Sequence, residues 1–332
     1  MNRVRPVFSL AFLAPFIAEF LFGATPLSRI AGFIFLALLY GGGAVVIREL
    51  VRRRSPGGWG RIAVLGVAYA FIEEGLVTQS FFNPTLFRAG EIGGRAMGVN
   101  FVWTEWTVGY HILWSLLIPI ALTELLFPEH RSEPWLTSGG LVAAGVCYVV
   151  GVAVIAMAFR RTVAPDFRAP QLHLILTVLA AFVLAVLALV WPVTPASSVA
   201  TARPGVAPSV WWLAAVMLVT TAGWFGLLFL PEVLKRGARV LIPMCAAVAL
   251  AAGGSRLVEN WSTALGWSDR HRLAMVLGAL PVTMLFGFFI VTAGSRIDQM
   301  GQAVGCLITA VLLISFAGRV RKRNPLTSIH VP

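Results

Sequence analysis

Two adjacent carboxylates interrupt an apolar stretch, AFIEEGL at residues 70–76. A charged carboxylate in the bilayer centre costs about 2.5–3.5 kcal/mol on insertion scales, so an ionisable residue within a span is a candidate for function. Consecutive side chains on an α-helix point about 100° apart. We therefore expect one of Glu73 and Glu74 to act at a site while the other orients it or bonds to a neighbouring helix. The alternative is that both carboxylates lie at the lipid–water boundary.

An imidazole follows at matched depth in the next apolar segment. His111 lies five residues into that segment, and Glu74 lies five residues before the end of its own. Consecutive spans run antiparallel, so both residues are expected about 8 Å below the same membrane surface. Glu19 falls on the same side, toward the outer leaflet. Carboxylate and imidazole together are typical of acid–base chemistry, although His111 could instead bond across helices for structure alone.

The connection between these two segments, residues 80–105, is long and carries both aromatic residues and glycines. Connections longer than about 12–15 residues are commonly lids or binding elements. We predict a re-entrant cover over the Glu/His cluster, with Asn83 and Asn100 as candidate hydrogen-bond donors. Asn83-Pro84 is also an ordinary turn starter.

Composition identifies the elements that must position these residues. The chain of 332 residues is 58% hydrophobic and only 12% charged, whereas soluble domains carry about 25% charged residues. This predicts an all-α, polytopic transmembrane bundle, because helices satisfy their own backbone hydrogen bonds in lipid. We predict ten spans, with eight as the alternative. They are 7–23, 30–47, 61–79, 106–127, 136–159, 172–191, 210–230, 240–255, 273–293 and 300–318.

The net charge of +12 is concentrated where the apolar segments end, for example at residues 48–54 and 319–323. This distribution indicates cytoplasmic loops and contact with anionic lipids and argues against a nucleic-acid binder. We expect a cell-membrane protein with both termini in the cytoplasm. Arg48-Glu49 is predicted to lie on a solvated helix end, with Glu49 paired to Arg52 and Arg53. Glu124 is predicted to pair with a neighbouring residue.

A segment rich in proline, alanine and serine divides the chain. We predict a six-span part at 1–192 that carries the Glu/His cluster, a linker loop at 193–208, and a four-span part with a basic tail at 209–332. Three isolated cysteines in apolar segments argue against a disulfide framework or a structural zinc site. No cofactor is expected, and no metal ligand is assigned. The trio of Glu73, Glu74 and His111 could bind a divalent ion, but the sequence alone does not establish one.

Glu73-Glu74, followed by His111 in the next span, resembles the CPBP (CAAX-protease and bacteriocin-processing) family of intramembrane glutamate proteases. That family carries Glu-Glu-x-x-x-Arg and then Phe-x-x-x-His. Here Thr78 stands in place of the arginine and Thr107 in place of the phenylalanine. The later His-x-x-x-Asn motif has no counterpart, and the resemblance covers about 50 residues. It implies that glutamate activates water and that histidine stabilises the oxyanion.

Three functions follow from these residues. The first is an intramembrane, peptidase-like hydrolase with Glu73, Glu74 and His111 as catalytic residues and with Glu19, Asn83 and Thr78 as further candidates. The second is a proton-coupled transporter or permease in which the carboxylates load protons and His111 relays them. The third is a non-catalytic membrane partner whose polar cluster holds helices together. The sequence leaves open whether the protein is an enzyme and which substrate or solute it takes.

Overall fold

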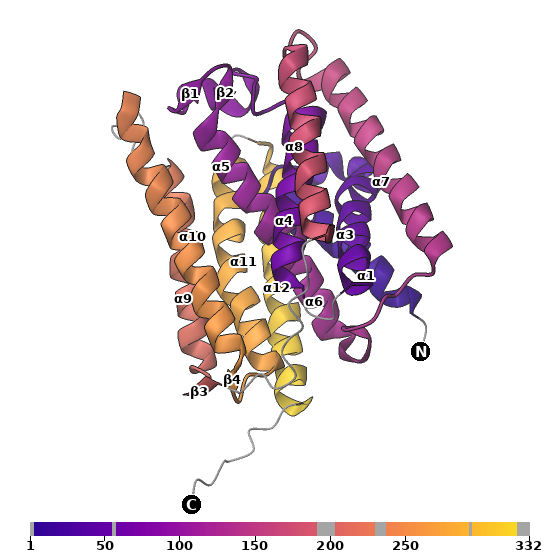
Figure 1. Ribbon diagram of the computed structural model, residues 1–332, viewed down its shortest axis with the longest axis vertical. Helices are drawn as coiled ribbons and strands as arrows, with labels where there is room; N and C mark the ends of the chain where they lie inside the picture. The colour runs from indigo at the N-terminus through magenta and orange to yellow at the C-terminus, as the bar shows by residue number, and fades with distance from the viewer. Residues whose placement is uncertain (1–2, 55–57, 191–202, 230–236, 292–293, 324–332) are drawn as a thin grey trace, which may run out of the picture. The chain divides into compact units, whose positions relative to one another are not determined.

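The computed structural model describes residues 3–54, 58–190, 203–229, 237–291 and 294–323, and it is 81% helical (Figure 1). The predicted all-α bundle is therefore confirmed. Strands are confined, in these residues, to two short pairs. Strand β1 (Arg95–Ala96) pairs antiparallel with β2 (Val99–Asn100), and β3 (Arg203–Val206) pairs parallel with β4 (Ala264–Leu265).

The α-helices are α1 (Val4–Pro15), α2 (Phe33–Leu36), α3 (Gly42–Arg52), α4 (Trp59–Ala70), α5 (Phe101–Tyr110), α6 (Ile118–Leu126), α7 (Ser138–Ala158), α8 (Gln171–Val190), α9 (Val210–Phe229), α10 (Leu241–Ser262), α11 (Asp269–Val291) and α12 (Arg296–Arg323). Several of them continue directly into π-helical turns, which are η1 (Phe16–Phe20), η3 (Ala37–Gly41), η4 (Phe71–Val77), η6 (His111–Leu117) and η8 (Phe159–Val163). The 3₁₀ turns are η2 (Leu27–Gly32), η5 (Leu86–Glu91), η7 (Pro128–His130) and η9 (Gly237–Val240).

Within the described residues, eight helices are long and apolar enough to cross a membrane. They coincide with eight of the ten predicted spans. The other two predicted spans, 7–23 and 61–79, coincide with the continuous helices α1–η1 and α4–η4. Every predicted span is therefore a helix, because long apolar runs bury their backbone polar groups only in that form.

The chain forms two compact units that interleave in sequence. The first comprises Met1–Glu19, Arg29–Thr194 and Gly223–Leu250, and the second comprises Phe20–Ser28, Pro195–Ala222 and Ala251–Pro332. The first part of the predicted linker, residues 193–202, lies outside the described residues. All predicted site residues belong to the first unit.

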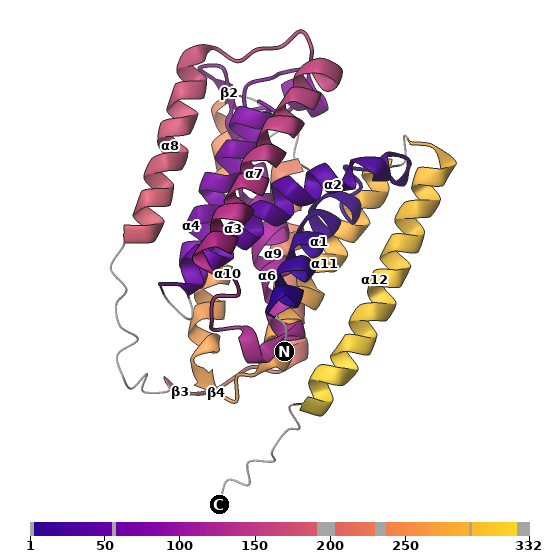
Figure 2. The same cartoon turned by 90° about the vertical axis from the view of Figure 1, so that its right-hand side faces the viewer.

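In the first unit, α4 packs against α8 and against η6, while α3 packs against α7 (Figures 1 and 2). Side chains such as Leu10, Tyr69, Trp114 and Leu116 fill its interior and are at most 2% exposed. The helix pair α4–η4 and α5–η6, which carries the acidic doublet and the histidine, is therefore surrounded by other helices.

The glycine run at 41–43 explains how these helices approach so closely. A Cβ atom on Gly43 would lie 2.6 Å from Cε2 of Tyr69, and one on Gly42 would lie 3.2 Å from Cα of Tyr148. Tyr69 is on α4 and Tyr148 is on α7. Small residues let neighbouring membrane helices pack backbone to backbone, and here they admit two tyrosines toward the polar centre.

We expect Gly43→Ala to lower the free energy of unfolding by about 1–3 kcal/mol, because the added methyl group overpacks the Tyr69 ring. The matched control is Gly145→Ala on α7, where a Cβ atom would meet nothing within 4 Å. Thermal unfolding of both variants in the same detergent measures the difference. Equal unfolding temperatures for the two variants would contradict the close packing at Gly43.

Candidate buried Glu/His centre

Four π-helical turns carry polar residues into the interior of the first unit. Glu19 lies on η1, Tyr40 on η3, Glu73 and Glu74 on η4, and His111 on η6. π-Helical turns are rare, and they occur frequently at functional sites. The polar residues of the centre lie on these turns, so the backbone geometry points to the same site as the residue types do.

The structure brings the acidic doublet and the histidine together. Nε2 of His111 lies 3.0 Å from Oε1 of Glu74, and Nδ1 of His111 lies 3.6 Å from Oε2 of Glu73. Nδ1 also forms a hydrogen bond of 2.9 Å with Oγ of Ser115. Glu73, Glu74 and His111 are 3%, 8% and 2% exposed, so the imidazole lies between two buried carboxylates.

The expectation that the two glutamates point in different directions was wrong, because both carboxylates contact His111. The separation of about 100° applies to an α-helix, whereas residues 71–77 form a π-helix. Its i→i+5 hydrogen bonds widen the turn and reduce the rotation between neighbours. Both glutamates are buried within the protein, so neither side chain is exposed to solvent or lipid.

The second oxygen of Glu74 is held by two hydroxyl groups. Oγ1 of Thr78 donates to Oε2 of Glu74 over 3.1 Å, and the hydroxyl of Ser80 donates to the same oxygen. Nε1 of Trp103 in turn donates to Oγ of Ser80 over 2.9 Å. Thr78 therefore contacts the centre, and the two ends of the 80–105 connection meet beside it.

All four tyrosines of the sequence surround this centre. The rings of Tyr40, Tyr69 and Tyr110 lie 6.1, 5.7 and 5.7 Å from the His111 ring, centroid to centroid, and Tyr148 stacks on Tyr69 at 6.1 Å. The hydroxyl of Tyr40 donates to Oε1 of Glu19 over 2.6 Å. This links Glu19, the third predicted carboxylate, to the cluster, and Glu19 is half-buried.

Sequence reasoning missed Ser80, Ser115, Trp103 and these tyrosines as members of the centre. Ser115 follows His111 by four residues, a spacing that places both side chains on one helical face. The scarcity of tyrosine in the chain was a second available signal. The partners of Ser80 and Trp103 follow from the fold alone.

Asn83 and Asn100 shape the connection and do not contact the carboxylates. Oδ1 of Asn83 accepts hydrogen bonds from the backbone N–H and the hydroxyl of Thr85, at 2.9 and 2.8 Å. Nδ2 of Asn100 donates to the Ala89 and Ile92 carbonyls. Asn83 is thus a turn residue, as the Asn-Pro alternative predicted.

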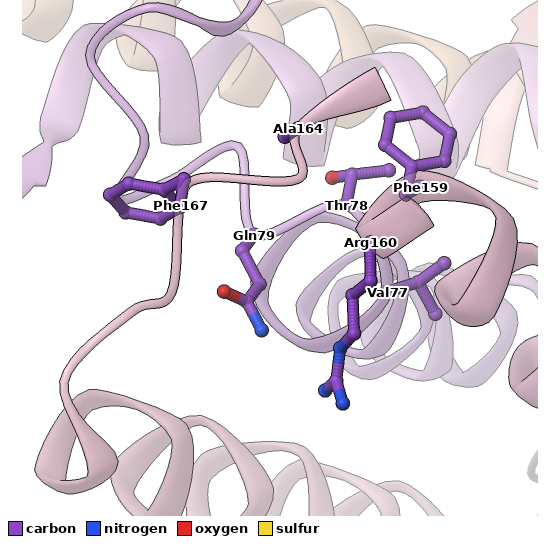
Figure 3. Close-up of a pocket in the computed structure, with 7 residues that line it drawn as sticks. All are labelled: Val77, Thr78, Gln79, Phe159, Arg160, Ala164 and Phe167. Atoms are coloured by element: carbon purple, nitrogen blue, oxygen red, sulfur yellow. The ribbon is translucent and has the colours of Figure 1, made fainter. Parts of the chain in front are cut away.

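A small pocket lies beside Thr78 (Figure 3). Its lining residues are Val77, Thr78, Gln79, Phe159, Arg160, Ala164 and Phe167. Gln79 has a left-handed backbone with φ of 58°, and its Oε1 accepts a hydrogen bond from the Ala169 N–H over 2.9 Å. Thr78 lines this pocket and also donates its hydroxyl to Glu74.

A second polar cluster corrects the prediction of a solvated helix end. Arg48, Glu49 and Arg52 are at most 4% exposed. Arg48 and Arg52 form ion pairs of 3.2 and 2.8 Å with Glu124, while Glu49 pairs with Arg48 at 2.9 Å. Glu49 also pairs with Arg53 at 3.9 Å, so that predicted pair is present. The predicted partner role of Glu124 is confirmed.

Arg48 forms hydrogen bonds with the backbone of the loop that follows α6. Its guanidinium donates to the carbonyl oxygens of His130, Arg131 and Glu133, and it stacks 3.5 Å from the centre of the Trp135 ring. A hydrogen bond from His130 lowers the pKa of the exposed Glu133 carboxyl. The cluster is hydrogen-bonded throughout, which is typical of a structural role.

His271 belongs to the second unit. One ring nitrogen lies 3.0 Å from the Pro208 carbonyl oxygen and the other lies 3.1 Å from Oγ of Ser268. Both nitrogens are therefore engaged within that unit.

The bundle and its buried polar centre define the protein as a multi-pass helical membrane protein. The model of a family described as "Uncharacterized membrane protein family" matches residues 8–323, so the chain belongs to that family. It does not match the CPBP family, and that resemblance rests on the motif residues alone. No curated protein and no solved structure matches the chain.

Proposed function

We propose that this protein is an intramembrane hydrolase, peptidase-like in its chemistry, with its centre at Glu73, Glu74 and His111. The observation that carries the proposal is the 3.0 Å contact between Oε1 of Glu74 and Nε2 of His111, inside a buried site. A carboxylate and an imidazole in such contact can share the proton transfers of hydrolysis.

The roles follow from the contacts. Glu74 takes a proton from a water molecule, whose oxygen attacks the carbonyl carbon of the substrate. His111 donates a hydrogen bond to the carbonyl oxygen as negative charge develops there. Glu73, 3.6 Å from Nδ1 of His111, acts as a positioning residue for the imidazole. Collapse of the tetrahedral intermediate then returns the proton to the leaving amine.

Thr78 supports this proposal at the position where the CPBP motif has arginine. Its hydroxyl donates to Oε2 of Glu74 and lines the pocket in Figure 3. Thr78 is therefore shared by the pocket and by the hydrogen bonds of the base. The deciding test is cleavage of membrane-anchored peptides by the protein in proteoliposomes, compared with its Glu74→Gln variant.

Proton-coupled transport is the second candidate, favoured by the 2.6 Å hydrogen bond between Tyr40 and Glu19. This bond extends the polar groups beyond the Glu/His trio. We expect Tyr40→Phe to slow proton flux driven by a pH gradient, because it removes a hydroxyl that donates to Glu19 and also interacts with Glu73. A pH-sensitive dye in proteoliposomes measures the flux.

The matched control for that experiment is Tyr110→Phe, since its hydroxyl donates to the Ala18 carbonyl over 2.6 Å and not to a carboxylate. Equal proton flux in Tyr40→Phe and the unmodified protein would remove the support for transport. A protein with neither cleavage nor flux would leave the third role, a non-catalytic membrane partner.

The location and partners complete the proposal. The chain is a membrane protein, and we propose the cell membrane with both termini on the cytoplasmic side. Basic residues of α12, at Arg321–Arg323, would contact anionic lipids. Reporter domains fused to each terminus test the orientation, and a periplasmic or extracellular signal from either would overturn it.

A further inference from the structure

The buried centre contains two carboxylates, and a bound cation would balance their charge. Both ion pairs that the described residues give to Glu73 and Glu74 are with the single imidazole of His111. With both carboxylates ionised, even an imidazolium would leave a net negative charge in an apolar interior, which is costly. A divalent cation with neutral imidazole would balance that charge.

The ligand atoms are already close together. Glu73, Glu74 and His111 each offer one atom, and these atoms all lie within 4.8 Å of one another. Ligands at about 2.0–2.1 Å from a tetrahedral ion are separated by about 3.4 Å. The 3.0 Å between Nε2 of His111 and Oε1 of Glu74 is near that value.

Oε2 of Glu73 and the hydroxyl of Tyr69 form no hydrogen bond of normal geometry among the described residues. The two groups interact with each other at longer range, and their side chains are 3% and 2% exposed. Buried acceptors normally have a partner, and an exception points to a bound ion or water. Glu73 is thus a carboxylate with ligand capacity to spare.

The surrounding hydrogen bonds orient the ligands as metal sites require. Ser115 bonds to Nδ1 of His111 and holds the imidazole with Nε2 toward Glu74. With Nδ1–H donating to Ser115, Nε2 would be free to ligate an ion. Thr78 and Ser80 occupy Oε2 of Glu74 and leave Oε1 for an ion. Outer partners of this kind fix the tautomer of a metal-bound histidine and hold a ligating carboxylate.

We propose that Glu73, Glu74 and His111 bind a divalent transition-metal ion of the zinc or manganese class. Imidazole suits zinc and iron, carboxylates suit manganese and magnesium, and a mixed set of one imidazole and two carboxylates favours Zn²⁺ or Mn²⁺. The site does not rest on the proposed hydrolysis, because a transporter could hold the same ion. If both proposals hold, Glu73, Glu74 and His111 would hold an ion that lowers the pKa of a bound water molecule. That contribution would replace the direct roles of Glu74 and His111, and cleavage would require the metal.

The test uses the full chain purified in detergent, stripped with chelator and titrated with Zn²⁺ alone. We expect about one bound zinc per chain and a rise in unfolding temperature that saturates with zinc. Glu73→Gln should lose both effects. Glu259→Gln is the matched control, because Glu259 lies in an exposed pair with Arg256, and it should keep both. Manganese binding, followed by electron paramagnetic resonance, provides a second probe.

Zinc binding by Glu73→Gln equal to that of the unmodified protein would overturn the proposal, and so would absence of binding by the unmodified protein. His111→Gln is the second variant, in case Glu73→Gln does not fold. The outcome is separable from the proposed function. Cleavage that persists in chelator would reject a metal requirement and leave the proposed hydrolase intact. Zinc binding without any cleavage would support the metal site and reject the hydrolase.

Discussion

Glu74→Gln is expected to slow the cleavage of a membrane-anchored reporter by about 10²–10⁴-fold. This is the usual contribution of general acid–base catalysis. Glutamine preserves the size of the side chain and can still contact His111, which lies 3.0 Å from the carboxylate. It cannot take a proton from water. The loss should therefore appear in the rate of cleavage and not in insertion of the protein into the bilayer.

The experiment compares three proteins in proteoliposomes: the unmodified chain, Glu74→Gln and Glu259→Gln. Glu259 is exposed and lies far from the centre in sequence, on α10, so its change should leave cleavage unaltered. Unfolding temperatures measured on the same samples separate a lost activity from a lost fold. Cleavage by Glu74→Gln at the unmodified rate would reject the hydrolase, and a fall in stability alone would support a structural partner.

Glu124→Leu is expected to lower the free energy of unfolding by about 3–5 kcal/mol, because breaking a buried ion pair leaves an uncompensated charge. Glu124 accepts hydrogen bonds from Nε of Arg48 at 3.2 Å and from Nε and Nη2 of Arg52 at 2.8 and 2.9 Å. Both guanidinium groups are at most 1% exposed. Leucine fills the volume but offers neither of them an acceptor.

The matched comparison is Glu259→Leu, which removes one partner of a pair whose side chains are 69% and 65% exposed. Exposed pairs contribute little, about 0–1 kcal/mol. Titration with denaturant in the same detergent measures the free energy of unfolding of both variants. Similar losses for the two variants would show that burial of the Arg48 cluster does not govern its energetics.

The amino-acid sequence determined the class of protein and the positions of its helices. Long apolar runs must become helices in lipid whatever their neighbours are, so each of the ten predicted spans coincides with a helix. The sequence also placed His111 opposite Glu74. Antiparallel neighbours with equal rise per residue match in depth, and this rule needs only the two segment boundaries.

The tertiary structure determined the directions of the polar side chains on those helices and their hydrogen-bond partners. The hydropathy of residues 71–77 predicts a helix but not its π-helical turn, so only the structure shows both glutamates directed at His111. The charge run at 48–54 predicts a solvated helix end. In the structure Glu124, which is distant in sequence, pairs with Arg48 and Arg52 in the interior. Hydropathy is a local property of the chain, whereas turn type, burial and hydrogen-bond partners depend on which distant segments pack together.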